Sequence, residues 1–271
     1  MKYRDYKIVE SLQEAYELNQ KRGNVLIGGN GWLKMQDRQA AKAIDLSALG
    51  LDCIEEENDK FVIGCMTTLR NLETNAALNI YTNGAMRESV RHIVGTQFRN
   101  CVTVGGSIFG RFGFSDVLTM FLALDCQVEL YHMGIIPLAE FAELPYDRDI
   151  LVRVFVQRTK RQSVYLSFRN QATDFPVLTC ACSILDKNLR VVIGARPAKA
   201  KVLEISSEKV EQFLLNENQS KMENINHLAC WASKQFSYSS NMRGSADYRR
   251  HLAQILIKRA CMTLMEGTYG N

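Results

Sequence analysis

The chain has 271 residues, of which 46% are hydrophobic and 23% charged, a composition typical of a globular protein long enough to hold two cores. Its formal net charge is only +4, and basic residues alternate with acidic ones, so we expect no binding to nucleic acid. No run approaches ~18 apolar residues and the N-terminus has no apolar signal core, so we expect a cytoplasmic protein that does not span a membrane.

In the first half of the chain, short helices are expected to alternate with short strands. Residues 11–22 predict an amphipathic helix capped by Ser11, with Glu14 completing a capping box. Further helices are expected from residue 68, within 83–94 and over 117–124. Strands are expected at 25–27, 43–46, 53–55, 61–64, 102–104 and 126–131.

The pattern changes to longer strands near residue 150. Four apolar stretches at short spacing predict an antiparallel meander, over 150–157, 163–170, 177–186 and 189–194. Two helices follow, one from about 206 and one over about 246–266. We therefore predict an α+β fold with a ligand-binding domain at 1–158, divided into sub-domains of about 1–55 and 56–158. A small domain of antiparallel sheet plus helices is expected at 159–271.

The eight cysteines and four histidines show no metal-ligand spacing. No Cys-x-x-Cys occurs, and Cys180 and Cys182 have the spacing of two residues on one face of a strand. Metal and iron–sulfur sites need tighter clusters of ligands than this. We predict no metal site, and we interpret the cysteines as small apolar residues kept reduced in the cytosol.

Two glycine pairs, each following a β-branched apolar run, are the most informative feature of the sequence. One lies in 25–31 and has Gly28 and Gly29; the other lies in 102–108 and has Gly105 and Gly106. Each pattern predicts a buried strand ending in a turn that can take a positive φ and approach a ligand closely. Such a turn leaves successive N–H groups unpaired, which favours an anion. Two of them suit the two phosphates of a dinucleotide, or a pyrophosphate and the sugar chain beside it.

Neither glycine pair belongs to a standard nucleotide-binding motif. Neither matches Gly-x-Gly-x-x-Gly or the P-loop, which disfavours a Rossmann fold and an NTPase. Ordinary tight turns use the same residues, so the pairs alone leave both interpretations open.

The sequence around these pairs resembles one family. Residues 92–108, continued to Ser115-Asp116 and 122–125, are similar to the FAD-binding subunit of molybdenum hydroxylases, the group of xanthine dehydrogenase and carbon monoxide dehydrogenase. The family pattern there contains Ile-Gly-x-x-Gln-Ile-Arg-Asn and Thr-Ile-Gly-Gly-Asn. Its first motif, Ala-Gly-Gly-Thr-Asp-Leu, corresponds to 27–33, and 243–250 resembles the Arg-x-Ser-Ala-x-Tyr-Arg-Arg signature of its C-terminal domain. The resemblance covers nearly the whole chain.

The resemblance implies a two-sub-domain FAD-binding domain and a set of cofactor-binding residues. The first motif is expected to wrap the FAD pyrophosphate with main-chain N–H groups. The second is expected to contact the other side of the diphosphate and the ribityl chain, while Ile93 and Phe109 wall the flavin ring. The residues so implied are Leu26, Ile27, Gly28, Gly29, Asn30, Gly31, Ile93, Thr103, Gly105, Gly106, Ser107, Phe109 and Asp116.

Asp116 and Arg111 each have two interpretations. Asp116 is expected to accept a hydrogen bond from a sugar or ribityl hydroxyl; it also has the position of a helix N-cap, and both roles can hold together. Arg111 is expected either to pair with a flavin phosphate or nucleotide, or to cap its loop in solvent.

The chain also departs from the family pattern. Asn30 and Gly31 replace Thr-Asp, Trp32 is bulky where the family is commonly polar or small, and Ser107 replaces Asn.

The resemblance implies an oxidoreductase subunit without a catalytic acid or base of its own. A molybdenum-cofactor subunit and a [2Fe-2S] subunit are the expected partners, and NAD+ is the expected acceptor of electrons from FAD. Two other functions stay open: a flavin-free structural or assembly subunit of such a complex, to which the change at Asn30 and Gly31 points, and a free-standing flavoprotein NADH oxidoreductase.

Overall fold

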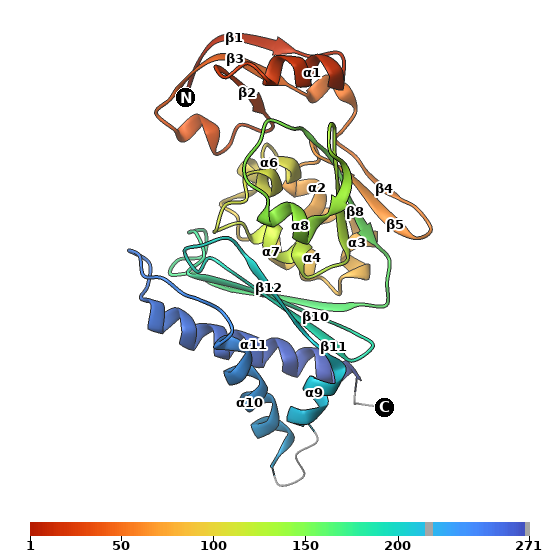
Figure 1. Cartoon of the computed structure of the whole chain (residues 1–271), viewed down its shortest axis with the longest axis vertical. Helices are drawn as coiled ribbons and strands as arrows, with labels where there is room; N and C mark the ends of the chain where they lie inside the picture. Colours follow the sequence, from red (N-terminus) through yellow and green to blue (C-terminus); the bar gives the residue numbers. More distant parts are fainter. Residues whose placement is uncertain (215–218, 269–271) are drawn as a thin grey trace.

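Three sheets are stacked along the long axis of the molecule in the computed structural model (Figure 1), which describes residues 1–214 and 219–268. The N-terminal sheet is parallel, in the order β1-β3-β2, and is followed by a five-stranded antiparallel sheet in the order β4-β5-β8-β6-β7. The third sheet is an antiparallel meander, β12-β11-β10-β9. This mixture of helices and sheets confirms the α+β prediction.

The N-terminal sheet carries one helix and two 3-10 turns. Its elements are β1 (Lys2–Ile8), α1 (Leu12–Asn19), β2 (Asn24–Ile27), η1 (Leu33–Met35), β3 (Gln39–Asp45) and η2 (Ser47–Leu49). As expected, Ser11 caps α1, because its side chain accepts from the N–H of Glu14. The capping box differs from the prediction: the Glu14 carboxylate accepts from the N–H of Glu10 rather than of Ser11.

The five-stranded sheet packs against short helices, and the sheet and helices together hold most of the first hydrophobic core. Its strands are β4 (Ile54–Glu56), β5 (Lys60–Gly64), β6 (Cys126–Leu130), β7 (Gly134–Pro137) and β8 (Leu151–Gln157). The helices are α2 (Leu69–Thr74), α3 (Ala76–Tyr81), α4 (Ala85–Val90), α5 (Thr96–Arg99), α6 (Val104–Phe109), α7 (Asp116–Leu122) and α8 (Leu138–Glu143).

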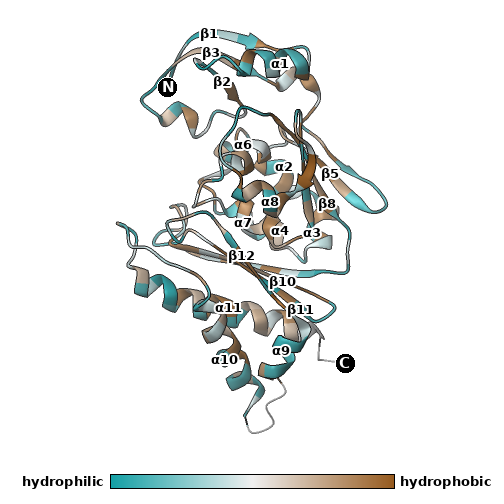
Figure 2. Cartoon of the chain, in the orientation of Figure 1, coloured by the Kyte–Doolittle hydropathy of each residue, from teal (hydrophilic) through white to brown (hydrophobic). Residues whose placement is uncertain are grey.

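The third sheet lies between two helical layers. Its strands are β9 (Gln162–Phe168), β10 (Leu178–Leu185), β11 (Asn188–Gly194) and β12 (Lys201–Ile205). The helices α10 (Lys221–Ser233) and α11 (Ala246–Thr268) cover one face, with α9 (Ser207–Leu214) beside them, while α4 and α7 contact the other face. In Figure 2 the strands β5, β10 and β11 are mainly brown, whereas the edge strand β1 is mainly teal.

Strand β10 presents one face to each of the two hydrophobic cores. Its side chains alternate, so that Cys180 and Cys182 face the second core under α11, with their sulfur atoms 3.7 Å apart. The opposite face carries small polar residues that bond to α7 and its C-terminal end: Thr179 Oγ1 lies 3.1 Å from Thr119 Oγ1, and Ser183 Oγ donates to the Ala123 carbonyl. The shared face predicted for the two cysteines is therefore confirmed.

Two sequence predictions about strands are wrong. The stretch 150–157 is not part of the meander: it forms β8, which pairs with β5 and β6 in the middle sheet, and β12 completes the meander instead. The run 102–104 is not a strand, because Val104 begins helix α6. Both apolar stretches form backbone hydrogen bonds with segments far away in the sequence, and their local pattern does not reveal these partners.

Candidate functional site

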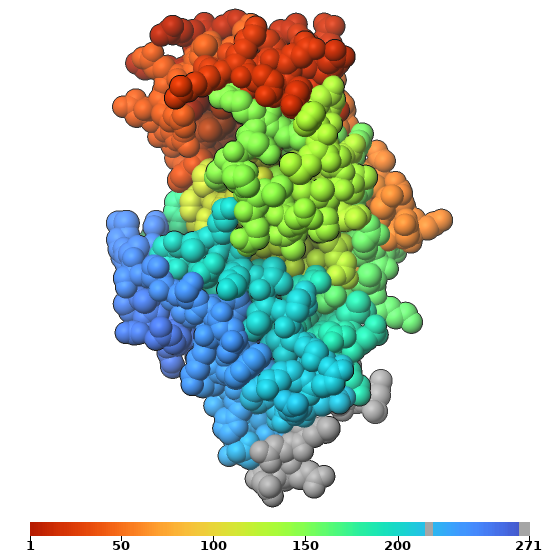
Figure 3. Space-filling view, viewed as in Figure 1, coloured from red at the N-terminus to blue at the C-terminus, as the bar shows by residue number. Residues whose placement is uncertain are grey.

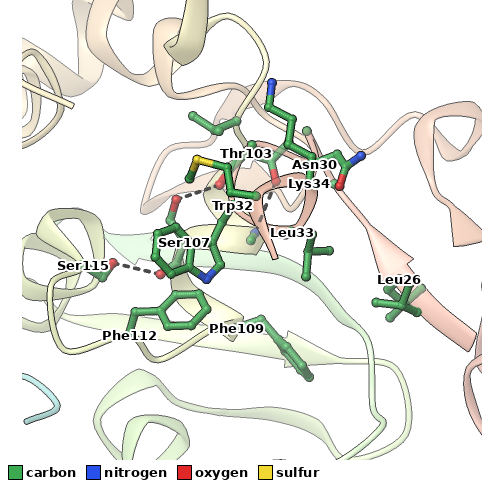
Figure 4. Close-up of a pocket in the computed structure, with 18 of the residues that line it drawn as sticks. Leu26, Asn30, Trp32, Leu33, Lys34, Thr103, Ser107, Phe109, Phe112 and Ser115 are labelled. Atoms are coloured by element: carbon green, nitrogen blue, oxygen red, sulfur yellow. Dashed lines mark hydrogen bonds between the residues drawn. The ribbon is translucent and has the colours of Figure 1, made fainter. Parts of the chain in front are cut away.

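A cavity of about 1020 Å³ opens between the N-terminal sheet, helix α6 and the segment that joins β9 to β10. The surface is hollowed where the N-terminal segment meets the yellow-green segment (Figure 3), and Figure 4 shows side chains from both entering this space. A volume of this size is in the range of natural sites for large organic ligands.

The first glycine pair forms one wall of the cavity and packs tightly against residues 101–102. A Cβ on Gly29 would lie 1.5 Å from the carbonyl oxygen of Cys101, and one on Gly31 would lie 2.2 Å from Cγ1 of Val102. The glycines are therefore required for close approach. They are not required for a positive φ: in this loop only Asn30 has one, at 54°, and its side chain accepts from the Tyr3 hydroxyl at 2.7 Å.

This loop offers a row of free donors to the cavity. The N–H groups of Gly29, Asn30 and Gly31 donate no hydrogen bond to any residue that the structure describes. Successive unpaired N–H groups at a loop form a concavity that favours anions. The expectation of unpaired donors is therefore confirmed for the first glycine pair.

The second glycine pair does not form such a turn, which corrects the prediction. Gly105 and Gly106 lie in the first turn of α6, neither has a positive φ, and their N–H groups are bonded within the protein. Gly105 donates to the Cys65 carbonyl at 2.8 Å, and Gly106 donates to Thr103 Oγ1 at 3.2 Å. What this segment offers to the cavity is the hydroxyl of Thr103, which accepts that bond and keeps its own proton to donate.

Most of the residues implied by the resemblance meet at the cavity. Eleven of the thirteen line it: Leu26, Gly28, Gly29, Asn30, Gly31, Ile93, Thr103, Gly106, Ser107, Phe109 and Asp116. The other two are absent from its wall. Ile27 is buried behind the loop, and a Cβ on Gly105 would lie 2.7 Å from Cys65, facing away from the cavity.

Asp116 is part of a buried ion pair at the cavity wall. Its Oδ1 accepts from Arg169 and from the Tyr165 hydroxyl, both at 2.5 Å, and both charged side chains are less than a tenth exposed. Burial raises the pKa of Asp116, although Arg169 and Tyr165 act to lower it. The N-cap interpretation is wrong: Ser115 caps α7, and Asp116 is its first residue.

Arg169 is the buried charged residue of the cavity wall, paired with Asp116, that the sequence interpretation missed. Its guanidinium lines the cavity, donates through Nη1 to the Asp174 carbonyl at 2.7 Å, and holds a buried Nε without a partner. The signal in the sequence was the stretch 165–174, which resembles the Arg-rich linker strand before the core of the family's C-terminal domain.

Arg111 fits neither of its two interpretations. It is 2% exposed and does not line the cavity. Its Nε donates to the Phe141 carbonyl at 3.0 Å, and the guanidinium lies 3.9 Å from the centre of the Phe141 ring. Its backbone is in the left-handed region, with a φ of 44°. We therefore assign Arg111 to the protein interior.

The charges around the cavity suit an anionic ligand. Basic side chains outnumber acidic ones on its wall, and two of the three carboxylates there, Asp116 and Asp174, are paired with arginines. The basic residues are Arg22, Lys34, Arg38, Arg148 and Arg169. Free N–H groups, a donor hydroxyl and excess positive charge together form a donor set for a diphosphate.

The described residues carry neither a membrane-spanning helix nor a cluster of metal ligands. No helix within 1–214 or 219–268 is long and apolar enough to cross a membrane. Among the same residues, no group of three or more His, Cys, Asp or Glu side chains could hold a metal ion. Four of the cysteines are buried, as expected, but Cys53 and Cys101 are exposed.

Comparison with known proteins gives two family matches that follow each other along the chain. Residues 1–158 match the FAD binding domain in molybdopterin dehydrogenase, and residues 163–264 match the CO dehydrogenase flavoprotein C-terminal domain. The chain is 26% identical to the nicotine 6-hydroxylase medium subunit of Paenarthrobacter nicotinovorans, covering 94% of each. It is 22% identical to the protein YgfM of Escherichia coli K12, covering 92% of this chain and 91% of YgfM.

Solved structures show the same fold. Quinoline 2-oxidoreductase from Pseudomonas putida 86 superposes with a TM-score of 0.83 at 18% identity, covering 97% of both chains. Carbon monoxide dehydrogenase from Hydrogenophaga pseudoflava gives 0.83 at 22% identity, covering 98% of both.

Proposed function

Because the chain belongs to the family of FAD-binding subunits of molybdenum hydroxylases, we propose that it is the electron-transfer subunit of such a complex. It is an oxidoreductase subunit, and its cofactor is FAD. In the proposed complex its partners are a molybdenum-cofactor subunit and a [2Fe-2S] subunit, and NAD+ is the acceptor. The free cysteines support a cytoplasmic location, where thiols stay reduced.

The observation that carries this proposal is the row of free N–H groups at Gly29, Asn30 and Gly31. Because these donors belong to the main chain, replacing Thr-Asp by Asn-Gly leaves them in place. They would hold the pyrophosphate of FAD, together with the Thr103 hydroxyl. Ser107 and Asp116 would face the sugar and ribityl hydroxyls, and Ile93 and Phe109 would supply apolar walls for a ring.

The chemistry that FAD supplies when bound is the transfer of electrons between one-electron iron–sulfur donors and a two-electron acceptor such as NAD+. The chain itself binds and orients the cofactor. Since the flavin carries the redox chemistry, we propose no catalytic acid or base in the chain.

The test is the visible spectrum of the purified chain, with heat-released flavin identified by chromatography. Flavin absorption and released FAD would support the proposal, and copurification with iron–sulfur and molybdenum subunits would support the complex. A colourless chain that also fails to take up added FAD would instead favour a flavin-free assembly subunit. NADH oxidation by the isolated chain, without copurifying partners, would favour a free-standing flavoprotein.

A further inference from the structure

Four aromatic side chains gather on the cavity wall from three separate segments. Trp32 follows the first glycine loop, Phe112 and Phe114 lie between α6 and α7, and Phe175 precedes β10. We call these four residues the aromatic cluster. Figure 4 shows Trp32 and Phe112 next to each other at the cavity, with Ser107 and Ser115 close by.

The rings of the aromatic cluster are in mutual contact. Phe112 and Phe114 are stacked, with ring centres 5.2 Å apart, and the Trp32 ring lies 5.0 Å from Phe114 and 5.5 Å from Phe112. Phe175 meets Phe114 edge-on at 4.6 Å and Trp32 at 5.8 Å. These are the separations and orientations in which aromatic rings attract one another.

The aromatic cluster belongs to neither hydrophobic core. All four residues are half-buried, and none is among the residues that make up or pack against the two cores. Aromatic side chains at a cavity wall are typical of ligand sites, where they bury a planar group. The cluster therefore has the character of a ligand surface rather than of a core.

Polar groups that suit the rest of a nucleotide surround the cluster. Trp32 directly follows the free N–H groups of the first glycine loop, and Phe114 is separated from Asp116 by one residue. Phe175 follows Asp174, whose carbonyl accepts from Arg169. Diphosphate donors and stacked rings thus meet within one cavity.

We propose that the aromatic cluster stacks on a planar ring of FAD and that Trp32 determines how tightly the cofactor is held. This inference rests on the proposed function and adds a residue to it. At Asn30 and Gly31 the chain lacks the hydroxyl and the carboxylate of the family pattern. Contact with the Trp32 ring supplies affinity that those side chains do not. FAD contains two planar rings, isoalloxazine and adenine, and the same stacking chemistry suits either.

The experiment compares equilibrium FAD binding by the flavin-free wild-type chain and three variants. Trp32→Leu removes the ring and should raise the Kd for FAD about tenfold or more, the usual effect of losing one stacked ring. Trp32→Phe keeps a ring and should recover most of the affinity. Trp231→Phe is the matched control, because Trp231 packs against Phe213 in the second core, and it should leave the Kd unchanged.

Riboflavin and AMP, titrated separately, identify the ring. Weaker riboflavin binding by Trp32→Leu assigns the cluster to isoalloxazine, and weaker AMP binding assigns it to adenine. Equal Kd values for FAD in the wild type and Trp32→Leu overturn the inference while leaving the proposed function intact. A wild type that binds no FAD overturns both. Thermal unfolding without FAD checks folding, and Phe114→Leu replaces Trp32→Leu if that variant does not fold.

Discussion

One glycine from each pair, Gly29 and Gly106, is expected to respond differently to the same chemical change, glycine to alanine. At Gly29 the new Cβ would lie 1.5 Å from the Cys101 carbonyl oxygen and 2.8 Å from Val102 Cα. Both of these are backbone atoms, which cannot move aside as a side chain can. Real Cβ atoms essentially never come closer than 3.0 Å to such atoms, so the loop must move by about 1.5 Å or more. Overpacking in well-packed regions costs about 1–3 kcal/mol, and a fixed backbone places this case at about 3 kcal/mol or above.

At Gly106 the same change meets little resistance. The nearest atom to its Cβ is Thr103 Oγ1 at 3.3 Å, and its φ is not positive. Because glycine inside a helix is less stable than alanine by about 0.5–1 kcal/mol, this small gain offsets the tight contact. We therefore expect Gly106→Ala to be close to neutral for stability.

The assay is thermal unfolding of the flavin-free variants beside the wild type. For a domain of this size 1 kcal/mol corresponds to about 2–4 °C, so Gly29→Ala should lower the apparent Tm by about 6 °C or more. Gly106→Ala should stay within about 2 °C of the wild type. A Gly29→Ala variant that melts with the wild type would refute the packing of the first loop on residues 101–102. A Gly106→Ala variant as destabilised as Gly29→Ala would refute the conclusion that α6 can accommodate a Cβ at Gly106.

Three further changes test the site. Gly106→Val places a branched side chain at the cavity wall and should abolish FAD retention while far-UV circular dichroism shows an intact fold. Thr103→Val removes the α6 cap and a ligand donor; it should cost about 1 kcal/mol in urea unfolding and raise the Kd for FAD in titration. Arg169→Met leaves Asp116 buried without its cation and should cost about 3 kcal/mol at neutral pH, measured by urea unfolding.

Each of these three predictions has a result that would contradict it. If Gly106→Val retains stoichiometric FAD, α6 does not belong to the FAD site. If Thr103→Val keeps the stability and the FAD affinity of the wild type, Thr103 neither stabilises α6 as its cap nor donates to FAD. For Arg169→Met the pH dependence is decisive. Burial raises the pKa of Asp116, and losing Arg169 raises it further, so the folded state keeps a proton that the unfolded state has lost. Stability must therefore fall as the pH rises from the ordinary carboxyl range through the raised pKa; a cost independent of pH contradicts the assignment.

Local patterns predicted the Ser11 cap and most strand positions but not the long-range pairing. Ser11 and the hairpin of β4 and β5 follow from residues within a few positions of each other, so the sequence identifies them. The β-branched run 102–104 looks like a strand, yet Val104 donates to Thr67 and Gly105 to Cys65, and helix α6 starts there. Strand β8 has the same apolar pattern as the meander strands; its partners β5 and β6 decide its sheet.

Most of the site residues implied by the resemblance line the cavity, but the sequence did not show which of their hydrogen-bonding groups are free. The resemblance singled out the first glycine loop, whose motif is contiguous in the sequence, and the structure places this loop at the cavity wall. The N–H groups of Val104 and Gly105 donate to the carbonyls of Thr67 and Cys65 in a distant segment, and no local pattern could reveal these bonds. The contacts of Arg169 with Asp116 and of Trp32 with Phe175 join segments far apart in the chain, so they became visible only in the folded structure.

Binding of FAD beside the first glycine loop is the central claim, and tryptophan fluorescence tests it most directly. The chain has two tryptophans, so Trp231→Phe leaves Trp32 at the cavity wall as the only one. Titrating this flavin-free variant with FAD should quench the Trp32 emission and saturate at one FAD per chain. Emission that stays constant at all FAD concentrations, with no FAD retained by the chain, would contradict the account.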